Sequence, residues 1–323
     1  MAANVDVESA ERRIRPYFNF TPVMASSYLN NLTGHNLFFK CENLQKTGSF
    51  KGRGAMNMIL KAKEDGPVKG VVGWSGGNHG QGVAWAAQEC KVPCTIVVPT
   101  AAPLKKIDAM KGYGSEVVIV ENQMQACTAE CEKIVKEQGY TLIDPMNDYT
   151  IMSGQGTIAK EFLAQVPDLD AILVSIGGGG LAGGVSKYIK DNKPSCKVFI
   201  VEPFGKDLQK SFEAGRRLHE YGLLMDTIAD GCRPKAVGDK CFKVMRECCE
   251  HTVLSVTDDE IKVAMKLIIE RMKLVVEGSA AMGLAAVLKH KEVLNKYTNI
   301  GLVLCGGNVD LSVLVGLPDY VEE

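Results

Sequence analysis

The sequence predicts an α/β fold in which largely parallel, twisted sheets are flanked by helices. Short apolar runs rich in β-branched residues alternate with stretches of helical period, and fully apolar strands are typical of parallel sheets covered on both faces. Three glycine-marked loops follow such runs, at the strand-to-helix turns where α/β proteins bind ligands. With 323 residues, 46% of them hydrophobic, the chain is long enough for two lobes.

Eight segments have the composition of strands. They are Asn36–Lys40, Gly70–Trp74, Pro93–Pro99, Glu116–Val120, Thr141–Asp144, Ala171–Ile176, Lys197–Glu202 and Asn299–Leu304. Helical patterns lie between most of them, for example over Gly80–Cys90 and Gln123–Gln138. The block from Gly70 to Asp148 holds four of these strands, so we expect it to form a lobe of its own, with a ligand cleft between the lobes.

Composition excludes several classes of partner. The net charge of -1 and the pI near 6.5 give no electrostatic footprint for nucleic acid or an anionic membrane. Met1 to Arg15 lacks the apolar core of a targeting signal, and no window approaches the ~18 apolar residues of a membrane helix. Eleven scattered cysteines, an odd number, predict free thiols in a reducing compartment. We therefore expect a cytoplasmic protein.

The first glycine-marked loop, Lys46–Ala55, leads into a helix predicted over Ser49–Lys61. A lysine at a helix start lies where the helix dipole disfavours a cation, which lowers the pKa of the amine and makes Lys51 a better nucleophile and base. An ordinary surface lysine gives the same pattern, so the position alone leaves both interpretations open.

The second loop, Ser75–Gln81, follows the predicted strand that ends at Trp74. Its small residues, its backbone N–H groups and the amide of Asn78 suit a carboxylate and a polar ring substituent. A tight strand-to-helix turn in which His79 packs or caps gives the same pattern, so this loop is also ambiguous on its own.

The third loop follows the strand predicted at Ala171–Ile176 and opens with four glycines, Gly177, Gly178, Gly179 and Gly180. Consecutive glycines let the backbone wrap a phosphate, and the next helix adds its N-terminal dipole. No Gly-Lys-Ser/Thr follows, so this is not a Walker A loop. Glu202 ends the next strand about 20 residues later, which leaves nucleotide binding open as an alternative.

Together the loops resemble one family, the pyridoxal-phosphate enzymes that include serine racemase and the serine/threonine dehydratases. The motifs that carry the resemblance run from about Thr21 to Asp310 and are TGSFKGRGA, SGGNHGQ, SGQGT, IGGGGLAGG, TIADG, ERMKLVVEGSAA and LCGGNVDL. The resemblance implies a two-lobed fold like that of tryptophan synthase β, usually as a homodimer. It also implies that residues 70–147 form a small domain inserted into a large domain of residues 1–69 and 148–323.

The resemblance assigns residues to the cofactor. Lys51 would bind pyridoxal 5'-phosphate covalently and act as general base, with Phe50 beside the ring. Asn78 would hydrogen-bond the ring hydroxyl, and Gly177–Gly180 would hold the phosphate. Cys305 would meet the pyridine nitrogen, and because a thiol is a weak donor and acceptor the nitrogen would stay largely neutral.

The resemblance also assigns a loop to the carboxylate of a small amino-acid substrate, namely Ser75, Gly76, Asn78 and His79. Serine racemases place a serine, the second acid that racemisation requires, where this chain has Gly76. They also carry a carboxylate-binding arginine where this chain has Cys127. We therefore expect dehydration of L-serine or L-threonine to a 2-oxo acid and ammonia.

The main alternative is serine racemisation, since a water molecule can replace a lost acid. Aspartate racemases of the family carry serines near Asn147, Asp148 and Tyr149, so the residues here disfavour aspartate as substrate. Further alternatives that stay open are dehydration of 3-hydroxyaspartate, racemisation of aspartate, and a catalytically dead nucleotide-binding regulator on the same fold.

Two accessory sites accompany the resemblance. A divalent cation, Mg²⁺ or Ca²⁺, would be held by Glu202, Asp207 and a carbonyl near Gly205. The alternative is an ordinary solvated loop, because the segment is one residue shorter than in serine racemases and contains Lys206. ATP would bind at the dimer interface, for which the alternative is a polar dimer seam. The nucleotide positions would be Ser26, Ser27, Tyr28, Lys46, Thr47, Gln81, Tyr113, Lys273 and Asn308.

Overall fold

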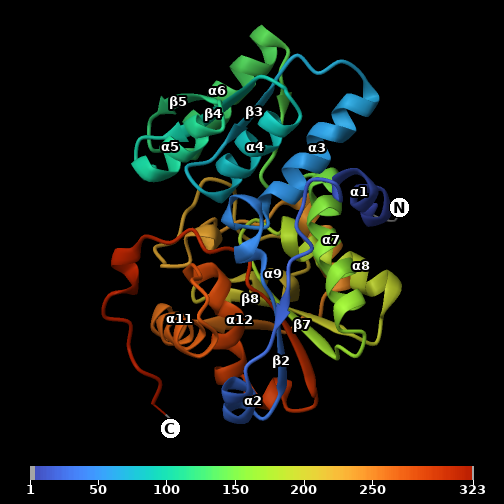
Figure 1. Cartoon of the computed structure of the whole chain (residues 1–323), viewed down its shortest axis with the longest axis vertical. Coiled ribbons are helices and arrows are strands. Elements are labelled where there is room, and N and C mark those ends of the chain that lie inside the picture. The colour runs from blue at the N-terminus through green and yellow to red at the C-terminus, as the bar shows by residue number, and fades with distance from the viewer. Residues whose placement is uncertain (1–3, 322–323) are drawn as a thin grey trace.

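The larger of two sheets has six strands and lies beneath a smaller sheet of four (Figure 1). The structure, a computed structural model, describes residues 4–321. Every neighbouring pair in the larger sheet is parallel except the antiparallel first pair. Its strands lie in the order β1 (Val23–Met24), β2 (Asn36–Lys40), β10 (Asn299–Val303), β7 (Ala171–Ser175), β8 (Lys197–Pro203) and β9 (Val253–Val256).

The smaller sheet is parallel throughout. Its order is β5 (Glu116–Val120), β4 (Cys94–Pro99), β3 (Val71–Trp74) and β6 (Thr141–Leu142). Parallel strands need long crossovers, which here are α4 (Asn78–Glu89), α5 (Leu104–Gly112) and α6 (Met124–Gln138). Side chains of a strand alternate between faces, so Ile96 and Val98 of β4 pack in the core under α4 and α5, whereas Val97 packs with α6.

Helices also cover the larger sheet, and α8 and α12 both pack against β7 and β8. Every residue of β7 is buried, as expected for a strand covered on both faces. The remaining helices are α1 (Val7–Ile14), α2 (Ser27–Thr33), α3 (Lys51–Asp65), α7 (Tyr149–Gln165), α8 (Gly180–Asn192), α9 (Leu208–Glu213), α10 (Asp239–Cys248), α11 (Asp258–Met272), α12 (Gly278–Lys289) and α13 (Lys291–Leu294). Short 3₁₀ turns are η1 (Glu42–Leu44), η2 (Lys46–Gly48), η3 (Asp230–Cys232) and η4 (Leu311–Leu314).

The predicted fold class is confirmed, and all eight predicted strands are present. The prediction missed β1 and β9, which have two and four residues. Helix α3 begins two residues later than predicted, because Ser49 is extended and pairs with Gly306 as an isolated bridge. The predicted domain boundaries at residues 70 and 147 stay a prediction.

Two compositional expectations also have structural counterparts. All eleven cysteines are unpaired, as predicted. Within residues 4–321, no helix combines the length and apolar character needed to cross a membrane.

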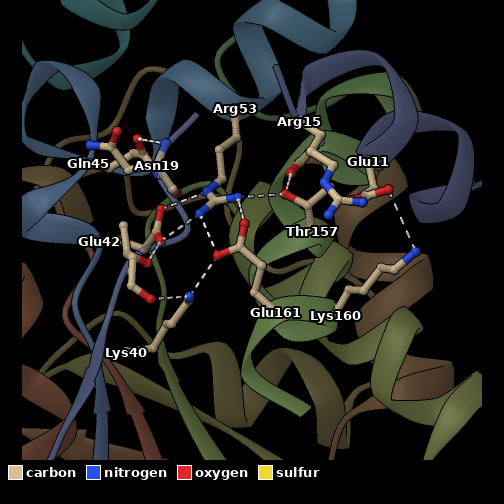
Figure 2. Close-up of polar contacts among 12 residues, drawn as sticks. Glu11, Arg15, Asn19, Lys40, Glu42, Gln45, Arg53, Thr157, Lys160 and Glu161 are labelled. Atoms are coloured by element: carbon tan, nitrogen blue, oxygen red, sulfur yellow. Dashed lines mark hydrogen bonds and ion pairs between the residues drawn. The ribbon is translucent and has the colours of Figure 1, made fainter. Parts of the chain in front are cut away.

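A buried network of charges joins β2, η1, α3 and α7 (Figure 2). Arg53 donates to Glu42 at 2.7 and 2.9 Å and to Glu161 at 2.6 Å. Lys40 donates to Glu161 at 2.6 Å and to the carbonyl of Thr21 at 2.8 Å. Burial by itself raises the pKa of Glu42, but Arg53 and Lys40 hold it below its usual range. The network therefore stays charged and fixes the first turn of α3.

Replacing Arg53 tests the contribution of this network to stability. Arg53→Met leaves Glu42 and Glu161 without their shared partner, so we expect the free energy of unfolding to fall by roughly 3–5 kcal/mol in urea titrations. Lys61→Met removes an exposed pair with Asp65 on the same helix and is the matched control, with an expected cost of about 0–1 kcal/mol. Equal losses in the two variants would show that the network is not a major source of stability.

Candidate active site

A cavity of about 390 Å³ lies where the two sheets meet. Its walls come from the carboxyl ends of β3, β4, β7 and β10 and from the first residues of α3, α4 and α8, together with the residue that precedes α12. This is where ligands bind in parallel α/β structures. The cavity brings together all three glycine-marked loops and Cys305.

Lys51 opens α3 and lies on the cavity wall. The N–H of Phe50 donates to the carbonyl of Cys305 at 3.1 Å, which ties the start of α3 to the segment after β10. The amine of Lys51 donates to the carbonyl of Pro145 at 3.0 Å and lies 5.3 Å from the centre of the Phe50 ring. Burial lowers the pKa of Lys51, against the opposing effect of Asp144. The pKa of the Lys51 amine is thus lowered, as the sequence predicted, and burial is the principal cause.

Close contacts surround the first three glycines of the third loop. A methyl group on Gly177 would lie 2.3 Å from the carbonyl oxygen of Gly231, and one on Gly178 would lie 1.7 Å from the sulfur of Met146. Gly179 has a φ of +102°, which L side chains rarely adopt. Helix α8 begins at Gly180, so its first N–H groups lack acceptors within the helix and favour an anion.

The Ser75–His79 segment forms the turn from β3 into α4. The hydroxyl of Ser75 accepts a hydrogen bond from the N–H of Gly77 at 3.0 Å. The ring of His79 contacts the carbonyl of Ile143 at 3.0 Å, and burial together with Lys51 lowers the pKa of His79 to about 3. The neutral ring therefore donates to Ile143 and anchors this turn.

Glu277 is a cavity residue that the sequence prediction missed. The amide of Asn78 donates to both carboxylate oxygens of Glu277, at 2.9 and 3.0 Å, and accepts from the amide of Asn308 at 2.9 Å. Burial, with Asp230 nearby, raises the pKa of Glu277 to about 7. The only sequence signal was the presence of Glu277 within the VEGSAA motif.

Cys305 lies on the same wall and is buried. Burial, with Glu277 nearby, raises the pKa of Cys305 well above its usual range, so this residue stays a neutral thiol. The sequence prediction also missed Lys106 and Asp230, which line the cavity. The ammonium of Lys106 donates to a carboxylate oxygen of Asp230 at 2.9 Å. This pair links α5, beside the small sheet, to η3.

Position 76 lies on the cavity wall but has no room for a side chain. A Cβ on Gly76 would lie 2.7 Å from the Cβ of Ala102. Cys127 is 2% exposed and packs in the core under α6 rather than on the cavity wall. Neither position therefore presents a polar side chain to the cavity.

The nine predicted nucleotide positions are spread over several elements. The amide of Asn308 donates to the carbonyl of Thr47 at 2.7 Å as well as to Asn78, which joins two of these positions to the cavity network. The guanidinium of Arg271 lies 3.9 Å from the centre of the Tyr28 ring. The remaining positions are Ser26 and Ser27 at the start of α2, Lys46 in η2, Gln81 in α4, Tyr113 after α5 and Lys273 after α11. The nucleotide site and the homodimer stay predictions.

Of the three predicted metal positions, Glu202 lies near the end of β8, and Gly205 and Asp207 lie in the turn from β8 to α9. Glu202 is buried and accepts the N–H of Leu208 at 2.8 Å, and burial raises its pKa to about 6. Gly205 and Asp207 both have positive φ, +87° and +64°. The carboxylate of Asp207 pairs with cationic side chains of this chain.

Comparison with known proteins identifies the family. A family model described as pyridoxal-phosphate dependent enzyme matches residues 14–306. The chain belongs to this family. It is 42% identical to a serine racemase of Dictyostelium discoideum over 95% of each chain. It is 41% identical to an L-threo-3-hydroxyaspartate ammonia-lyase of Saccharomyces cerevisiae over 95% of this chain and 93% of the relative.

Solved structures agree with this assignment. A pyridoxal 5'-phosphate-dependent aspartate racemase superposes with a TM-score of 0.94 at 42% identity, over 98% of this chain and 99% of the other. The chain is thus a pyridoxal-phosphate-dependent enzyme of the racemase and ammonia-lyase family, as the sequence predicted. Because racemases and a lyase are equally similar, identity does not separate the two reactions.

The cavity fits pyridoxal phosphate. It presents a buried amine at Lys51, an anion-binding turn at Gly177–Gly180 and a neutral thiol at Cys305. The glycines of the turn let its backbone lie close to Gly231 and Met146.

Gly177→Ala tests the phosphate assignment. The new methyl group meets the backbone at Gly231 and displaces the turn. We therefore expect the affinity for pyridoxal phosphate, titrated by absorbance, to fall by about tenfold or more. Each factor of ten corresponds to roughly 1.4 kcal/mol of binding free energy. Gly112→Ala, in α5 with no atom near the added methyl, is the control and should bind as tightly as wild type. An unchanged affinity for Gly177→Ala would contradict the assignment.

Glu277→Gln tests the ionisation in the cavity. A carboxyl whose pKa is raised on folding contributes stability below its unfolded pKa near 4.5, and this stability is lost as pH rises through about 7. The free energy of unfolding of the variant minus that of wild type should therefore increase between pH 4.5 and 7. Glu64→Gln, which removes a partner of Arg13 on α3, is the control and should not reproduce this increase. A flat difference for Glu277→Gln would show that its pKa is not raised.

Proposed function

We propose that this enzyme dehydrates L-serine or L-threonine to the 2-oxo acid and ammonia. The observation that carries the proposal is the close contact of Gly76 with Ala102, because it leaves no acid at the position from which serine racemases supply one. Lys51 is then the side-chain base of the cavity, and a single base removes the α-proton without returning it to the opposite face.

The residues of this chain have separate tasks in the proposed reaction. Pyridoxal phosphate, when bound, supplies an aldehyde that reacts with amines and a ring that accepts electrons. Burial lowers the pKa of Lys51 and so favours the neutral amine, which can accept the α-proton. The turn Gly177–Gly180 binds the phosphate with backbone N–H groups. Cys305 offers the ring nitrogen no charge, which favours rapid loss of a β-hydroxyl.

The substrate carboxylate would bind at the start of α4. Helix α4 begins at Asn78, so the first N–H groups of this 12-residue helix lack acceptors within it, and the helix dipole adds to their attraction for an anion. The hydroxyl of Ser75 and the ring of His79 hold the turn in place through Gly77 and Ile143.

A second candidate is the dehydration of L-threo-3-hydroxyaspartate. Lys106 lines the cavity and supplies a cation that a second carboxylate on the substrate would meet in place of Asp230. The yeast relative that acts on this substrate is as similar to the chain as the serine racemases are.

Product analysis tests the proposal. We expect the holoenzyme with L-serine to form pyruvate in large excess over D-serine, measured by coupled reduction of the oxo acid and by chiral chromatography. L-Threonine and L-threo-3-hydroxyaspartate are assayed in parallel. Lys51→Ala should form neither product. D-serine without pyruvate would overturn the proposal.

Restoring an acid at position 76 tests the reason given for the outcome. We expect Gly76→Ser combined with Ala102→Gly, which makes room for the hydroxyl, to raise the ratio of D-serine to pyruvate by about tenfold or more. Ala102→Gly alone is the control and should leave the ratio unchanged. An equal ratio in the double variant and the control would mean that the missing acid does not decide the reaction.

A further inference from the structure

Lys206 is a buried cation outside the cavity walls. It lies in the turn between β8 and α9, and its side chain is among the largest fully buried ones of the described residues, with the residue 1% exposed. Positive φ at Gly205 and Asp207, on either side, turns the side chain inward. A buried ammonium costs free energy unless acceptors surround it, so this arrangement needs a reason.

The ammonium of Lys206 donates a short hydrogen bond to the carbonyl of Pro234. Pro234 ends the segment Asp230–Pro234, all of which lines the cavity. The same segment packs against the phosphate turn, since a methyl group on Gly177 would meet the carbonyl of Gly231. Lys206 therefore supports the Asp230–Pro234 segment of the cavity wall without lining the cavity itself.

The carboxylates around Lys206 are already occupied. Asp207 pairs with Lys210 at 2.8 Å and with Lys235 and His219 at 3.4 Å each. Glu202 accepts a backbone N–H and acts on Lys206 by its charge. Glu202 and Asp207 thus do not share an open site at which both could bind one metal ion.

The space beside Lys206 is small and positively charged. The pocket beside Lys206 has a volume of about 10 Å³ and is lined by further cations, among them Lys235 and Arg217. A calcium or magnesium ion takes six or more oxygen ligands and is repelled by ammonium groups. Within residues 4–321, no cluster of three or more His, Cys, Asp or Glu side chains is arranged to hold a metal.

We infer that the ammonium of Lys206 takes the place of the divalent cation that the sequence predicts at Glu202, Gly205 and Asp207, and that the enzyme needs no divalent metal. Lys206 is a positioning residue, which acts on cofactor and substrate through Pro234 and the segment before it. This inference goes beyond the proposed reaction and holds whichever amino acid is the substrate.

Metal titration of the wild-type holoenzyme is the first arm of the test. Mg²⁺ or Ca²⁺ after treatment with EDTA should leave the melting temperature unchanged, should give no saturable heat by calorimetry, and should change oxo-acid formation by less than about twofold. Saturable binding of either ion with a rise in melting temperature would overturn the inference.

Lys206→Met is the second arm, since it keeps most of the side-chain volume and removes the charge. We expect faster hydrogen exchange confined to residues 228–238, a pyridoxal-phosphate affinity about tenfold weaker, and no rescue by Mg²⁺ or Ca²⁺. Lys210→Met is the matched control and should behave as wild type. It removes an exposed partner of Asp207 that lies in α9. An affinity equal to that of the control, or rescue by either ion, would contradict the inference, and the wild-type titration decides the question if the variant does not fold.

Discussion

The need to neutralise one buried guanidinium organises the active site of this protein. Arg53 is almost fully buried, and its charge is tolerable only with Glu42 and Glu161 beside it. Those partners come from η1 and α7, so the first turn of α3 can occupy only one position between them (Figure 2). Lys51 lies two residues before Arg53 in that turn. A network outside the cavity thus holds the turn from which the amine of Lys51 enters the cavity.

Close backbone approach is the second constraint. Gly54 and Gly154 bring α3 against α7, and a methyl group on either would meet the other helix at 3.0 Å or less. Gly177 likewise brings the turn Gly177–Gly180 against Gly231. Helix α3 also shares a core with the small sheet through Ala55 and Ile59. The two lobes therefore meet at a closely packed interface. The cavity is the region of this interface that side chains do not fill.

The sequence predicted the parts of the structure that depend on local pattern. Fully apolar segments such as Ala171–Ser175 were placed correctly because burial on both faces leaves a continuous apolar run. Glu277, Lys106 and Lys206 were not assigned their positions, because nothing in the local pattern distinguishes them from exposed charged residues. Their surroundings arise from contacts between residues far apart in the chain, such as Asn78 with Glu277. The cause of the lowered pKa of Lys51 was likewise hidden, since burial is a property of the whole fold.

We propose that one side-chain base, Lys51, serves the reacting carbon and that nothing at position 76 serves the opposite face. The isotope and chirality of unreacted serine test this most directly. L-Serine is incubated with the holoenzyme in deuterium oxide and recovered at partial conversion. We expect the recovered serine to remain L, with any deuterium at Cα confined to the L enantiomer, because proton removal and return occur on one face. Deuterated D-serine in an amount comparable to deuterated L-serine would contradict it.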